Sequence, residues 1–152
     1  MKDRVNLKAL EADAIHAFTH GYMCSETTVH VLNKHFGLGM PRESIRMSTG
    51  FPYGFGRGGN ICGAVAGATM AIGMVFGRDE AGDPKYKQCT DLTRELNDKV
   101  IAACGTATCP EYVKDYEFTT PERKNHCKII VIAAVDAFAD IMERERGIKI
   151  ER

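Results

Sequence analysis

The chain has 152 residues, with 20 Lys and Arg against 20 Asp and Glu, and 44% of its residues are hydrophobic. This length predicts one domain, residues 1–152, with enough apolar side chains to fill a core. The formal net charge is zero, so the chain lacks the excess of basic residues that nucleic acids and acidic membranes attract. We therefore expect neither as a partner. The first residues lack the apolar stretch and cleavage site of an export signal, which predicts a cytoplasmic protein.

Apolar positions recur every three to four residues along most of the chain, which predicts helices. The expected helices cover residues 6–20, 24–36, 41–47, 61–76, 85–103 and 121–146. No segment shows convincing alternation of apolar and polar residues, so no strand is expected. We therefore predict an all-α fold, a single-domain bundle of about five to seven helices around a central helix of small residues.

The expected central helix, residues 61–76, carries no charged residue. It is shorter than the roughly 20 residues that a membrane-spanning helix needs, so we expect it to be buried in the protein core. Gly63, Gly67 and Ala71 recur every four residues, and such a stripe lets another backbone approach closely. That backbone belongs either to the same chain or to a second subunit, so a homodimer is one expectation.

A glycine-rich segment, residues 50–60, precedes this helix and is expected to be a loop. Unpaired N–H groups at the following helix start favour negative charge there. We expect Gly58, Gly59 and Gly63 to contact a bound group. Arg57 is a candidate for neutralising a bound anion or a thiolate-ligated cluster.

The six cysteines are about 4% of the chain, fewer than in small disulfide-rich domains. In a reducing compartment we expect thiols, which either pack as apolar residues or act as metal ligands and redox groups. The sequence has no Cys-x-x-Cys, which argues against a thioredoxin-type dithiol and a paired zinc knuckle. It also lacks the motifs of covalent haem, phosphate-binding loops and serine hydrolases.

Four of the cysteines lie in loops or near helix starts: Cys24, Cys62, Cys109 and Cys127. A thiolate is favoured at Cys62, because a helix dipole stabilises negative charge near its start. Four sulfur ligands from four separate segments suit a tetrahedral or polynuclear thiolate site. Cys89 lies on the apolar stripe of its helix and is expected to be a packing residue, whereas Cys104 is open to either interpretation.

The segment from Gly50 to Ala68 resembles the signature of a family named for a C-GCAxxG-C-C cysteine pattern. Cys24 resembles the family's first cysteine, and Cys62-Gly63-Ala64-x-x-Gly67 resembles its central motif. Cys109 and Cys127 resemble the third and fourth cysteines, whereas Cys89 and Cys104 match no family position. The resemblance implies a small helical redox protein whose four cysteines hold an iron–sulfur cluster or another redox group.

Four functions remain open from the sequence. The first is electron transfer to a redox partner protein by an iron–sulfur cluster on the four cysteines. The second is a structural or sensing zinc module built on the same thiolates. The third is metal-free thiol catalysis, in which Cys62 is the nucleophile and Cys24 or Cys109 is the resolving cysteine. The fourth is a helical interaction protein with packed cysteines. His126, beside Cys127, is a candidate for tuning or joining the site.

Overall fold

The structure is a computed structural model that describes residues 1–152, and 66% of them are helical. In chain order the elements are β1 (Arg4–Asn6), α1 (Leu7–Thr19), α2 (Cys24–Phe36), α3 (Glu43–Ser48), α4 (Pro52–Arg57), α5 (Gly63–Phe76), α6 (Tyr86–Cys104), α7 (Cys109–Tyr112), α8 (Pro121–Arg146) and β2 (Lys149–Glu151). This confirms the all-α class. The long helices begin and end within about two residues of their predicted limits.

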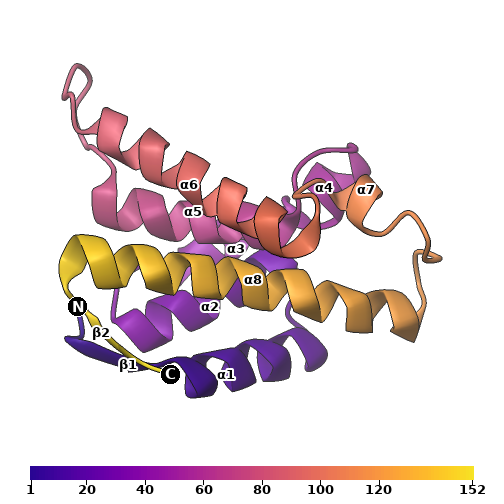
Figure 1. The fold of residues 1–152 in the computed structure, drawn as a ribbon. Helices are drawn as coiled ribbons and strands as arrows, with labels where there is room; N and C mark the ends of the chain where they lie inside the picture. Colours follow the sequence, from indigo (N-terminus) through magenta and orange to yellow (C-terminus); the bar gives the residue numbers. More distant parts are fainter.

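Helix α5 is the centre of the bundle, as predicted. It packs against α2, α6 and α8, and its first six residues are all buried (Figure 1). A Cβ atom at Gly67 would overlap the hydroxyl of Thr28 and the carbonyl oxygen of Ser25 in α2. The glycines of α5 therefore allow α2 of the same chain to approach. The stripe of small residues is therefore already buried against other helices of the same chain. The homodimer stays a prediction.

The core is one continuous cluster that joins every long helix. Its largest fully buried side chains include Phe36, Phe76 and Phe138, and the rings of Phe36 and Phe138 meet edge to face with centroids 5.1 Å apart. None of the helices combines the length and the apolar character needed to cross a bilayer.

The two ends of the bundle differ (Figure 1). At one end the N- and C-termini lie together, because β1 and β2 pair in parallel, with Val5 opposite Ile150. The sequence analysis was wrong to expect no strand, since two strands of three residues are too short to show a repeating pattern. At the other end lie α4, α7 and the first turns of α8.

The glycine-rich segment contains a left-handed turn, where the sequence predicted an irregular loop. Residues 53–57 all have positive φ, and three of them, Tyr53, Phe55 and Arg57, are not glycine. Each such residue costs about 1–2 kcal/mol, so surrounding contacts must hold the turn. A Cβ atom at Gly54 would lie 2.8 Å from the carbonyl oxygen of Asn60 and 2.9 Å from Cβ of Cys109. The turn is therefore pressed directly against the segment that carries Cys109.

Candidate functional site

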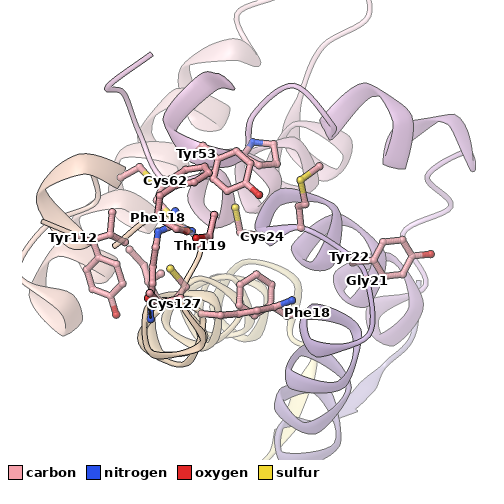
Figure 2. Close-up of a pocket in the computed structure, with 18 residues that line it drawn as sticks. Phe18, Gly21, Tyr22, Cys24, Tyr53, Cys62, Tyr112, Phe118, Thr119 and Cys127 are labelled. Atoms are coloured by element: carbon pink, nitrogen blue, oxygen red, sulfur yellow. Dashed lines mark hydrogen bonds between the residues drawn. The ribbon is translucent and has the colours of Figure 1, made fainter. Parts of the chain in front are cut away.

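A cavity of about 260 Å³ lies at the α4–α7 end of the bundle. Its lining includes all four cysteines that the sequence predicted as ligands: Cys24, Cys62, Cys109 and Cys127. Figure 2 shows Cys24, Cys62 and Cys127 around one space, with Tyr53 and Phe18 on opposite sides of it. The lining contains no Asp, Glu or His, so sulfur is the main ligand type that the cavity offers.

Each of the four cysteines comes from a different helix and lies near the start of that helix. Cys24 is the first residue of α2, Cys62 directly precedes α5, and Cys109 is the first residue of α7. Cys127 lies in the second turn of α8. The start of a helix carries partial positive charge, which favours a thiolate and opposes the effect of burial on these thiols.

Backbone hydrogen bonds between two loops bring Cys62 and Cys109 together. The N–H of Cys62 donates to the carbonyl oxygen of Ala107 at 2.7 Å. The N–H of Cys109 donates to the carbonyl oxygen of Asn60 at 2.9 Å. These two bonds lie on either side of the bridge between Ile61 and Thr108. Residues almost 50 positions apart in the chain are thus fixed at one wall of the cavity.

Side-chain contacts fix the start of α2, where Cys24 lies. The carboxylate of Glu26 accepts a hydrogen bond from the N–H of Met23 at 2.9 Å and another from the hydroxyl of Thr49 at 2.7 Å. The buried hydroxyl of Ser25 donates to the carbonyl oxygen of Ser48 at 2.7 Å. The residues on both sides of Cys24 are therefore anchored, and its sulfur has a defined place.

The side chains of Cys24 and Cys62 form a close hydrogen-bonded pair. The Cys62 thiol donates to the sulfur of Cys24, which lowers the pKa of Cys24, and the N–H groups of Ser25 and Tyr53 lower it further. The same contact, followed by burial, raises the pKa of Cys62 well above its ordinary value. The raised pKa of Cys62 disagrees with the predicted thiolate there, and Cys24 is the member of the pair whose pKa is lowered.

Cys109 and Cys127 share the side chain of Arg123 as a neighbour. Burial raises the pKa of both thiols, that of Cys127 to about 11, and the guanidinium of Arg123 opposes both shifts. Arg123 lines the cavity and lies four residues before Cys127 in α8, on the same helical face. The sequence analysis missed Arg123, although this spacing could have identified it.

Aromatic rings and guanidinium groups form one side of the cavity opening. The rings of Tyr53 and Phe118 lie 4.7 Å apart, and both line the cavity. The guanidinium of Arg57 lies 4.1 Å from the centroid of Phe118, and that of Arg123 lies 4.8 Å from it. These contacts link α4 to α8 and help to hold the left-handed turn.

The four residues predicted to contact a cofactor lie outside the cavity lining: Arg57, Gly58, Gly59 and Gly63. Gly58, Gly59 and Arg57 are exposed, and the guanidinium of Arg57 contacts the lining through the rings of Phe118 and Tyr53. Gly63 is close, since a Cβ atom there would overlap the sulfur of Cys24. Its part in the site is therefore to leave room for that sulfur. Contact between these residues and a cofactor stays a prediction.

Three further residues considered in the sequence do not line the cavity. Cys89 belongs to α6 and packs against the core, as expected for a packing residue. Cys104 hydrogen-bonds to Tyr112, which lines the cavity. The ring of His126 stacks between Tyr112 and Tyr116, and its Nε2 lies 3.0 Å from the carbonyl oxygen of Tyr112. His126 therefore connects α7 to α8 and is not part of the cavity lining.

The cysteines line one cavity without forming a ready-made metal site. No group of three or more Cys, His, Asp or Glu side chains has an arrangement that could hold a metal ion. The donor set nevertheless fits a soft metal centre, because four thiols, two cationic side chains and mostly apolar residues line the cavity.

A comparison with family models identifies the relatives of this chain. Residues 22–141 match the model of the family described as "Putative redox-active protein (C_GCAxxG_C_C)". Neither the search of curated proteins nor that of solved structures found a match. The matched segment contains all four cysteines of the cavity and the glycines that place them. The chain therefore belongs to the C_GCAxxG_C_C family of redox-active proteins.

Proposed function

We propose that Cys24, Cys62, Cys109 and Cys127 bind an iron–sulfur cluster and that the protein transfers electrons to a redox partner protein. The observation that carries this proposal is that four cysteines from four segments of the chain line one cavity whose lining has no carboxylate or imidazole side chain. A site for thiol chemistry alone would need only two of them.

The residues of the chain have separate roles around such a centre, which would supply a one-electron couple when bound. Arg123 offsets part of the thiolate charge beside Cys109 and Cys127. The N–H groups of Ser25 and Tyr53 donate to the sulfur of Cys24, and hydrogen bonds of this kind tune the reduction potential. The apolar side chains of the lining limit the access of water.

The composition of anaerobically purified protein tests the proposal. We expect bound iron and acid-labile sulfide, with absorption in the visible range. Serine at any one of the four cavity cysteines should remove most of the iron, because each supplies a ligand. Cys89→Ser is the matched control, since Cys89 is partly buried but lies outside the cavity, and it should keep the iron. Zinc in place of iron, or protein without metal, would contradict the cluster.

A second candidate function is dithiol–disulfide exchange by Cys24 and Cys62, favoured by their direct contact. The Cys24 thiolate would attack a disulfide of a partner, and the Cys62 thiol would then displace the partner. One disulfide forms between Cys24 and Cys62, while the disulfide of the partner is reduced to two thiols. In metal-free protein this predicts a Cys24–Cys62 disulfide after mild oxidation, detectable by peptide mass spectrometry. Cys109→Ser and Cys127→Ser should still form it.

A further inference from the structure

One wall of the cavity is positively charged and has no carboxylate partner, although Arg123 hydrogen-bonds to Cys109 and Lys124 lies over the ring of Phe18. Its only charged lining residues are Arg123 and Lys124, both in the first turn of α8. Neither takes part in any of the ion pairs of the molecule. Cations are unfavourable at the start of a helix, where the dipole is positive. The stability of α8 therefore does not explain these two charges.

Arg123 also has a buried donor that lacks an acceptor. Its NH1 donates to the carbonyl oxygen of Phe118 at 3.3 Å, and its guanidinium lies 5.4 Å from the centroid of Tyr53. Its Nε is buried and has no hydrogen-bond partner. A buried charged donor without an acceptor costs about 1–3 kcal/mol or more. The protein holds this guanidinium in place and leaves one N–H free.

A second guanidinium strengthens the positive charge of the wall. Arg57 and Arg123 both lie against the ring of Phe118, and Arg57 has no carboxylate partner. Two like charges near one ring repel each other unless an anion lies between or beside them. Thr119, which precedes α8, adds a hydroxyl to the lining next to these cations.

We propose that this wall, formed by Arg123, Lys124 and Thr119, binds a small anion with oxygen acceptors. A carboxylate or a tetrahedral oxyanion in the cavity can pair with the guanidinium of Arg123 and with the ammonium of Lys124. The cavity, at about 260 Å³, limits the ligand to a small molecule. This ligand site goes beyond the proposed cluster and does not depend on it.

Titration calorimetry with sulfate and with acetate, in a buffer free of chloride, tests this proposal. The protein is used as purified and also with all four cavity cysteines changed to serine, which removes both cluster and sulfur. We expect saturable binding to both proteins. Binding of sulfate alone would assign the site to tetrahedral oxyanions, and binding of acetate alone to carboxylates. Circular dichroism verifies that each variant is folded.

Arg123→Gln should weaken the binding at least tenfold, because it removes the positive charge and the guanidinium donors. Lys128→Gln is the matched control, since Lys128 lies one turn further along α8, outside the cavity, and should bind as before. Arg123→Lys keeps the charge and should bind with intermediate affinity. The proposal is overturned if neither anion binds saturably, or if Arg123→Gln binds as well as the wild type. It is also overturned if only the serine protein binds, because the cysteine sulfurs would then be the acceptors for Arg123 in the natural protein.

Discussion

Cys24 and Cys62 occupy similar places at the starts of two helices, yet the pKa values of their thiols shift in opposite directions. The sulfur of Cys24 accepts hydrogen bonds from the thiol of Cys62 and from the N–H groups of Ser25 and Tyr53, which lower its pKa. Cys62 is buried, and its own thiol is the donor. The position of a cysteine in a helix is therefore not enough to assign its charge, because the neighbouring sulfur has the larger effect. The sequence could not show this neighbour, which lies 38 positions away.

Asp136 is a residue whose charge costs stability without serving the site. Burial and then the negative charges of Glu11 and Asp140 raise its pKa to about 6, and its Oδ1 is buried without a hydrogen-bond partner. The protonated carboxyl group of Asp136 binds its proton more tightly in the folded than in the unfolded protein, which stabilises the fold at low pH. This contribution is fully present below the pKa of the unfolded state and is lost as the pH rises through about 6. At neutral pH the ionised carboxylate is therefore unfavourable.

Asp136→Asn should accordingly raise the free energy of unfolding near neutral pH by about 1–2 kcal/mol, a value reduced for solvent screening. The gain should shrink as the pH falls from neutral towards about 4, because the carboxyl group of the folded protein is then protonated. Urea unfolding of the metal-free protein at both pH values measures the difference. The control Asp140→Asn should lose stability, because Asp140 accepts from Lys99 and Arg152. A less stable Asp136→Asn protein at neutral pH would contradict this account.

At the scale of elements, the contact between α2 and α5 explains the glycines of the family motif. A Cβ atom at Gly63 would overlap the sulfur of Cys24, and one at Gly67 would overlap the hydroxyl of Thr28. The same packing therefore holds the two helices together and leaves the space in which Cys24 meets Cys62. The sequence predicted a close approach along this stripe, but the identity of the approaching helix depends on the tertiary arrangement.

A pair of glycine substitutions in α5 tests this contact. Gly67→Ala should lower the free energy of unfolding by about 1–3 kcal/mol, because the new methyl group forces α2 and α5 apart. Gly73→Ala is the matched control in the same helix, where a Cβ atom meets nothing within 4 Å. It should raise stability by about 0.5–1 kcal/mol, because alanine favours the helix. Chemical denaturation in the same metal state measures both, and equal effects would contradict the close-contact explanation.

The left-handed turn of α4 marks the limit of prediction at this scale. Five glycines in residues 50–60 correctly excluded an ordinary helix or strand. They gave no sign that Tyr53, Phe55 and Arg57 would share the left-handed conformation, since these residues avoid it locally. Tertiary contacts hold them, including the ring of Phe118 against Tyr53 and Arg57. Local propensity therefore predicts where the regular helices end but not the form of this turn.

At the scale of the whole molecule, the paired termini and the candidate site lie at opposite ends of the bundle. The termini are tied together by β1 and β2 at one end, and the four cysteines line a cavity at the other (Figure 1, Figure 2). The helical pattern of the sequence predicted the bundle, and the family motif identified the cysteines. The positive wall around Arg123 could not be predicted, because it forms where α4, the loop before α8 and α8 itself meet.

The central claim is that four sulfur atoms form one centre, and alkylation under anaerobic conditions tests it most directly. Mass spectrometry reports how fast each cysteine of the native protein reacts. We expect Cys24, Cys62, Cys109 and Cys127 to be protected together and to become reactive together once a chelator removes the metal. Cys89 should react at the same rate before and after chelation. The account would be contradicted if one of the four reacted as fast as Cys89 while the other three stayed protected.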